Sequence, residues 1–123
     1  MHRSSDRDIS QVEELFVAPK AMVAMIHVQA LPGTPYAHFS MQAIIDQAVR
    51  EAELLARAGF NAILIENMHD RPYLCQQVGP EVVAGMAAVL DAVRRVVDLP
   101  LGVQILAGAN HEALAVAMVG GAT

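Results

Sequence analysis

Three short apolar runs, each followed by a loop and a helical pattern, constrain the fold of this chain more than any other feature. The runs span residues 21–28, 61–67 and 99–106. Each has the length of a buried strand and is far too short to cross a bilayer. Strands that alternate with helices build right-handed βαβ units. The pattern therefore predicts an α/β domain with a parallel sheet.

The first two long helices carry clear end signals. Ser40 is a candidate N-cap for a helix that stops at Gly59, and Pro80 suits the first position of the next helix. That second helix should turn an apolar stripe to the core, made of Val82, Val83, Met86, Leu90, Val93 and Val97.

The third long helix is expected to begin with Asn110 as its cap and to stop at Gly120 and Gly121. Its inward residues are predicted to be Leu114, Ala117 and Met118. Before the first strand, residues 9–17 have a helical spacing of apolar residues, which predicts a short helix. Residues 1–8 are expected to be a disordered tail.

The aliphatic composition agrees with this arrangement. Of the 123 residues, 54% are hydrophobic, 17% are charged and only 4% are aromatic. A chain of this length suits one domain. Its core must be built from Val, Ile, Leu, Met and Ala, as in parallel strands buried between helices.

Three parallel strands would leave two unpaired edges on a strongly apolar sheet. A complete (β/α)₈ barrel needs roughly 200 residues or more. We therefore expect residues 9–123 to be a partial domain, either the N-terminal (βα)₃ part of a larger barrel or a truncated product. Self-association through the strand edges is one way to cover them.

Charge and cysteine content exclude several classes of protein. The formal net charge is -5 and Arg94–Arg95 is the only basic pair, which disfavours nucleic acid and anionic membrane surfaces as partners. With Cys75 as its only cysteine, the chain cannot form an internal disulfide. The N-terminus has neither a secretory nor a transit pattern, so we expect a cytoplasmic protein.

Polar residues gather where the predicted strands end. Parallel α/β folds bind ligands at the carboxyl ends of their strands, so these residues form the candidate site. They are His27 and Gln29 after the first strand, Glu66, Asn67, His69 and Asp70 after the second, and Gln104 and Asn110 around the end of the third.

Each of these residues also has a structural interpretation. A histidine at a strand end is often a neutral imidazole bonded to backbone, so His27 is either structural or functional. Glu66 is costly to bury unless it is paired, which favours a role at the mouth of the site. Asn67 suits a left-handed turn, and Asn110 suits a helix cap. His69 and Asp70 lie further into the loop, where solvation is the alternative.

The chemistry open to this cluster is acid/base catalysis or, on weaker grounds, metal binding. Glu66 with His27 or His69 would suit proton transfer. Glu66, His69 and Asp70 offer ligands for a divalent metal, but their spacing matches no standard motif, so no metal ligand is assigned and the cofactor stays unknown. Cys75 is best explained as a packed thiol.

Four segments together resemble the BtpA/SgcQ family. They are "AMIHVQALPGTP", "ENMHDRPYL", "GPEV" and "LGVQILAGANHEALAVA", and the similarity covers about residues 12 to 122. The resemblance implies a TIM barrel of the ribulose-phosphate-binding type, roughly twice the size of this chain. It also implies that His27, Glu66, Asn67, Asp70 and Asn110 line a pocket.

No reaction is firmly attached to that family, so two classes of function stay open. The first is an enzyme acting on a small polar or phosphorylated sugar or nucleoside, with Glu66 and His27 catalytic. Asn67, His69, Asp70, Gln104 and Asn110 would then bind substrate. The second is a non-catalytic assembly or stability factor of the photosystem I biogenesis type. In either case the chain alone is expected to be inactive.

Overall fold

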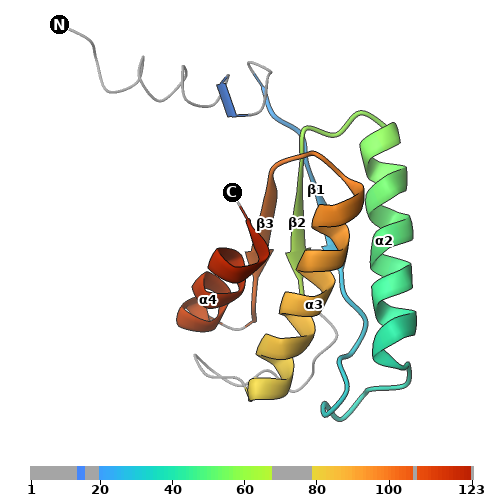
Figure 1. Ribbon diagram of the computed structural model, residues 1–123, viewed down its shortest axis with the longest axis vertical. Helices are drawn as coiled ribbons and strands as arrows, with labels where there is room; N and C mark the ends of the chain where they lie inside the picture. The colour runs from blue at the N-terminus through green and yellow to red at the C-terminus, as the bar shows by residue number, and fades with distance from the viewer. Residues whose placement is uncertain (1–13, 16–19, 68–78, 107, 123) are drawn as a thin grey trace, which may run out of the picture.

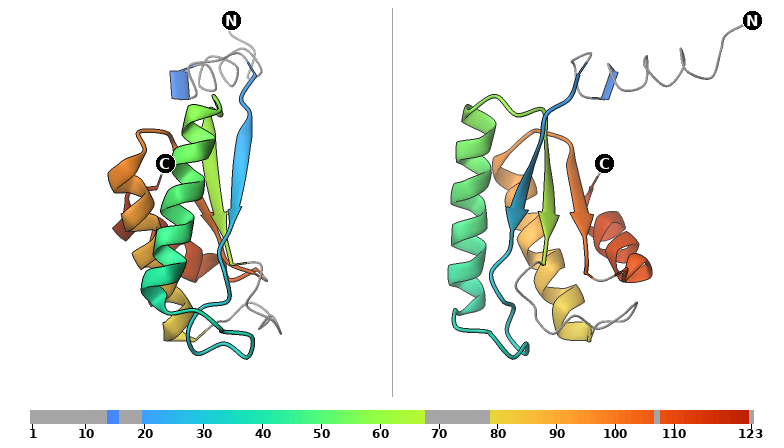
Figure 2. Two further views of the ribbon diagram at one scale, coloured as in Figure 1. Left: turned by 90° about the vertical axis from the view of Figure 1, so that its right-hand side faces the viewer. Right: turned by 180° about the vertical axis from the view of Figure 1, so that it is seen from behind.

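The computed structural model describes residues 14–15, 20–67, 79–106 and 108–122. Its described sheet has three parallel strands in sequence order, which are β1 (Val23–His27), β2 (Ala62–Glu66) and β3 (Leu101–Gln104). The helices that follow them cover one face of the sheet and are α2 (Met41–Arg57), α3 (Pro80–Val96) and α4 (Asn110–Gly120) (Figure 1; Figure 2). The predicted α/β alternation with a parallel sheet is confirmed for these residues.

All three strands are shorter than the apolar runs that predicted them. Before β2, Asn61 pairs with Met22 through two bonds: its side-chain Oδ1 accepts the amide N–H of Met22 at 2.8 Å, and its own amide N–H donates to the carbonyl oxygen of Met22 at 2.9 Å. Before β3, Pro100 has no N–H to donate to a neighbouring strand. Hydrophobicity alone does not reveal these local features at the starts of β2 and β3.

The expected ends of α2 and α3 are confirmed. The hydroxyl oxygen of Ser40 accepts the amide N–H of Ala43 at 3.2 Å, and α2 ends before Gly59, whose φ is +93°. Pro80 is the first residue of α3. The inward face of α3 follows the predicted stripe, except that Val83 is only half-buried.

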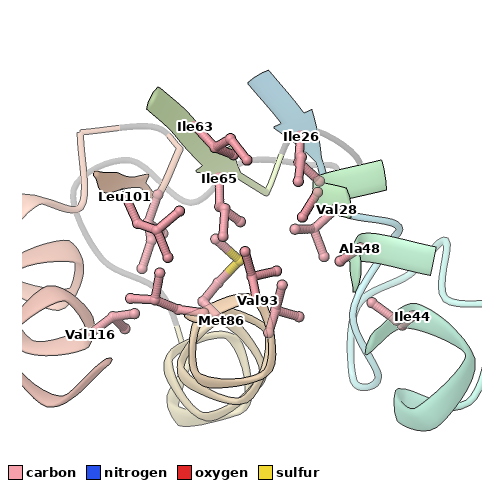
Figure 3. Packing of buried hydrophobic residues seen from close by; sticks show 14 of the residues in the cluster. Ile26, Val28, Ile44, Ala48, Ile63, Ile65, Met86, Val93, Leu101 and Val116 are labelled. Atoms are coloured by element: carbon pink, nitrogen blue, oxygen red, sulfur yellow. The ribbon is translucent and has the colours of Figure 1, made fainter. Parts of the chain in front are cut away.

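The core lies between the sheet and the helices (Figure 3). The side chains of Ile26 and Ile65 reach from the strands toward Met86 and Val93 on α3, and Ile44 packs from α2. The five side chains are each no more than 1% exposed. This cluster accounts for the strong preference for aliphatic residues in the sequence.

Helix α4 differs from its prediction in two respects. Its N-cap is Ala109, and Asn110 is instead the first helical residue and makes no side-chain cap bond. The predicted inward residues Leu114 and Met118 are 63% and 85% exposed, whereas Val116 and Gly120 face the core. After its polar first turn the helix is apolar on all sides, so the spacing of its apolar residues does not identify an inward face.

A close contact selects the buried face of α4. Gly120 lies directly against the side chain of Leu90, and a larger residue would collide with it there. Helix α4 can therefore approach α3 closely only with its Gly120 side inward. As a result, the bulkier apolar residues point away from the described part of the chain.

Arg94 joins two turns at the amino end of the sheet. Its guanidinium donates from Nη1 to the carbonyl oxygen of Leu99 and from Nη2 to that of Gly121, both at 3.0 Å. Leu99 precedes β3, and Gly121 directly follows α4. One side chain thus links the turn into the third strand with the turn out of the last helix.

Of the predicted helix over residues 9–17, only Glu14 and Leu15 are described, and both are helical. The predicted tail, residues 1–8, lies outside the described residues. No helix among the described residues is both long enough and apolar enough to cross a membrane.

Candidate functional site

One face of the sheet is left uncovered by the described helices (Figure 2). The residues of β1 alternate in exposure: Val23, Met25 and His27 are exposed, whereas Ala24 and Ile26 are buried beneath the helices. Because side chains alternate along a strand, Val23, Met25 and His27 belong to the uncovered face. The same face of the sheet carries the candidate site.

A polar row crosses this face at the carboxyl ends of the strands. His27 pairs in register with Glu66, and Glu66 pairs with Gln104 on the other side. Adjacent strands lie about 4.8 Å apart, so the three side chains are near neighbours. The register brings together three residues that the sequence separates by 39 and 38 positions.

Glu66 is the most unusual member of the row. It is only 8% exposed, whereas His27 and Gln104 are exposed. Among the described residues, no hydrogen bond or ion pair to its carboxylate is found. The buried side-chain atoms without a partner in the described residues are Arg94 Nε and Glu112 Oε2, so the Glu66 oxygens keep some contact with solvent. A side chain that is buried up to a solvent-accessible carboxylate suits a site that opens at this end of the strands. The geometry therefore singles out Glu66 as the chemical centre of the row.

Asn67 has a structural bond in addition to its predicted role. It is 1% exposed, and its Oδ1 accepts the amide N–H of Leu106 at 2.7 Å. This bond ties the end of β2 to the segment after β3. Substrate binding by Asn67 stays a prediction, because the bond shows only what its oxygen contacts in this structure.

The other predicted site residues lie outside the polar row or outside the described residues. Asn110 is exposed at the start of α4, and its amide N–H donates to the carbonyl oxygen of Gly108. His69, Asp70 and Cys75 lie outside the described residues. Of the eight candidate residues at the strand ends, the register thus brings together His27, Glu66 and Gln104.

A hollow of about 350 Å³ adjoins the row between β1 and α2. His27 and Gln29 line it from the strand side, and Gln47 and Glu51 line it from α2. The two α2 residues were missed by the sequence analysis. Their spacing of four residues, which places both on one helical face, is the signal that marks them as a pair.

The amino half of the uncovered face is apolar. A hollow of about 160 Å³ is lined there by Val23, Ala62, Leu64, Gly102 and several neighbours. Leu64 leans over Gly102, where a methyl group would lie 2.9 Å from its Cδ1. The uncovered face thus changes from apolar at the strand starts to polar at the strand ends.

No group of three or more His, Cys, Asp or Glu residues able to hold a metal ion is found in the described ranges. The described part of the row offers one imidazole, one carboxylate and one amide. These groups suit hydrogen bonding and proton transfer to a small polar ligand.

Sequence comparison now defines the class of protein. The profile of the BtpA family matches residues 18–123, and the chain therefore belongs to that family. The matched region includes every described element of the sheet and the whole polar row. No solved structure is significantly similar to the chain.

Two curated relatives from different organisms are uncharacterized proteins. An uncharacterized mitochondrial protein of Caenorhabditis elegans is 40% identical over 116 residues, which cover 89% of this chain and 42% of that protein. An uncharacterized protein of Archaeoglobus fulgidus is 37% identical over 98 residues, covering 80% of this chain and 39% of the relative.

A third relative has a descriptive name. The photosystem I biogenesis protein BtpA of Synechocystis is 32% identical over 109 residues, which cover 89% of this chain and 38% of that protein. The chain thus spans about two fifths of the length of these three relatives.

Proposed function

We propose that this chain forms the first three βα units of a (β/α)₈ barrel of the ribulose-phosphate-binding type. The strands follow one another in sequence order, and the described helices all cover the same face. Doubly wound sheets carry helices on both faces, whereas a barrel carries them only outside. The uncovered face would then be the barrel interior. The greater length of the relatives supports this proposal.

The row His27–Glu66–Gln104 is proposed to be part of a small-molecule site of an enzyme. Its substrate class would be a small polar or phosphorylated sugar or nucleoside. Glu66 would act as the general acid/base and His27 would polarise or assist, while Gln104 holds a substrate hydroxyl or carbonyl group. Asn67, His69, Asp70 and Asn110 would complete the site. The burial of the Glu66 side chain within this polar row is the observation that carries this proposal.

A thermal-shift screen tests this function. The chain and a full-length relative would be screened against sugar phosphates and nucleosides, with and without Mg²⁺. A ligand at 100 times its Kd stabilises the folded state by about 2.7 kcal/mol. We expect saturable stabilisation that Glu66→Gln abolishes and that Glu53→Gln, an exposed change on α2, leaves intact. If no compound stabilises either protein, the proposal fails.

An assembly factor is the second candidate function, and it is favoured by the name of the Synechocystis relative. The polar row would then contact a peptide of a client complex. The discriminating experiment replaces the Glu66 equivalent with Ala in that relative. Intact photosystem I levels together with loss of a metabolite conversion would contradict the assembly role. A fall in photosystem I without any metabolic change would support it.

The exposed apolar residues support a proposal of self-association for the chain on its own. Leu114, Met118 and Val119 on α4 are each at least 63% exposed, and Met25 on β1 is 44% exposed. Such patches mark contact surfaces. We expect concentration-dependent dimers in light scattering after size exclusion, weakened by Met118→Lys. A monomer at all concentrations would contradict this expectation.

A further inference from the structure

The segment after β1 forms a tight turn with a defined geometry. The carbonyl oxygen of Leu31 accepts the amide N–H of Thr34 at 3.1 Å and the hydroxyl of Thr34 at 2.7 Å. Pro32 occupies the second position, and Gly33 has φ +94° in the third. This combination defines a type II turn, whose third position favours glycine.

The turn is held against α3 by two close contacts. Leu31 is fully buried and fills a notch at Gly85, where a methyl group would lie 2.9 Å from its Cδ2. Two residues further on, a methyl group at Gly33 would lie 2.9 Å from Cγ of Glu81. The turn therefore leaves no space for larger side chains at either glycine.

Glu81 combines two interactions at the start of α3. Its methylene groups pack on Gly33, and its carboxylate folds back over Gly79, the N-cap residue, in the space that a Cβ would occupy. A carboxylate in the first turn of a helix also interacts favourably with the helix dipole. The side chain thus has a defined place between the β1–α2 turn and the helix start.

We propose that Glu81 is a positioning residue of the candidate site. By wedging between Gly33 and Gly79, it fixes the path of residues 28–31 past the mouth, and with them Gln29 beside His27. Gln29 is half-buried and lines the same hollow as His27. The function of this wedge rests on the proposed small-molecule site. The wedge would thereby hold Gln29 in the lining of the hollow beside His27.

Amide hydrogen exchange of the 123-residue chain tests the wedge directly. Glu81→Ala should make the Thr34 amide exchange about tenfold faster, which corresponds to about 1.4 kcal/mol of local opening free energy. The amides of β2 should keep their rates. The side-chain amide signals of Gln29 should shift in the same variant, because its surroundings change.

Three further variants separate a wedge from a general helix effect. Glu81→Gln keeps the methylene groups, so it should restore the wild-type Thr34 rate. Glu112→Ala removes the matching carboxylate from the first turn of α4 and should leave Thr34 unchanged. Gly33→Ala should open the turn at least as much as Glu81→Ala, because it both strains φ and displaces Glu81.

Three results would overturn the proposal: an unchanged Thr34 rate in Glu81→Ala, equal acceleration by Glu112→Ala, or failure of Glu81→Gln to restore the rate. These readouts need no ligand. A failed ligand screen would therefore remove the proposed substrate class and leave the wedge standing. Conversely, if a ligand binds and the Thr34 rate is unchanged in Glu81→Ala, only the wedge proposal fails.

Discussion

On the helix-covered face of the sheet, Ile26, Ile65 and Leu101 are at most 1% exposed, whereas on the uncovered face Val23 and Met25 are 50% and 44% exposed. The same strands supply both faces. The covered face is aliphatic throughout, and it is where burial stabilises the fold. The uncovered face does not have to be aliphatic for the fold to be stable, and it holds the largely buried Glu66 at one end. Stability and chemistry are thus separated by the alternation of side chains along each strand.

The largest effect should come from neighbouring residues of β2 that face opposite ways. Ile65→Ala should lower the free energy of unfolding by about 3 kcal/mol, because it opens a cavity in the packed core. Leu64→Ala should cost about 1 kcal/mol, since that side chain is only half-buried on the uncovered face. Urea unfolding followed by circular dichroism measures both. Equal costs would show that the two faces are equally packed.

The next comparison concerns two asparagines at opposite ends of β2. Asn67→Ala should cost about 2 kcal/mol, because it leaves the amide N–H of Leu106 without its partner in a partly buried position. Asn61→Ala removes a similar bond to Met22, but in an exposed position, and should cost about 0.5 kcal/mol. Urea midpoints give both values. A larger loss at Asn61 would reverse our ranking of the two strand ends.

A change of opposite sign is expected at the polar row. Glu66→Gln should raise the free energy of unfolding by up to about 1 kcal/mol, because it removes a charge from a side chain that is only 8% exposed. Glu53→Gln, on the exposed face of α2, serves as the control and should change stability by less than about 0.5 kcal/mol. If Glu66→Gln destabilises the chain, the carboxylate has a stabilising partner and its functional assignment weakens.

The smallest effect is expected on the outer face of α4. Met118→Lys should alter the free energy of unfolding by less than about 0.5 kcal/mol, since Met118 is 85% exposed. Val116→Ala, on the inner face of the same helix, should cost about 2 kcal/mol. The difference between these two costs, measured by thermal unfolding at low protein concentration, checks the orientation of α4. Similar costs would mean that α4 buries both faces.

The alternation of strands and helices was predictable because it depends on local signals. Ser40, Gly59 and Pro80 mark helix ends through their own backbone and side-chain chemistry. The orientation of α4 was not predictable in this way. Beyond its first turn its residues are apolar on every side, and the orientation is decided by the contact between Gly120 and Leu90, which joins two helices.

The candidate site was predictable only in part for the same reason. His27, Glu66 and Gln104 come together because strand register is regular, so their positions at strand ends were sufficient to group them. The placement of Asn67 and Asn110 depends on loop geometry. Glu81 was not selected at all, since its role comes from a steric fit to Gly33 that no spacing pattern contains.

The paired carbonyl contacts of Arg94 have a mechanical consequence. A pull applied to the chain beyond α4 would load the Nη2 bond to Gly121 and, through the rigid guanidinium, the Nη1 bond to Leu99. Force would therefore pass to α3 and to the start of β3 before it unravels the last turn of α4. In a single-molecule stretching experiment, these elements should yield together, as one step in the force–extension curve.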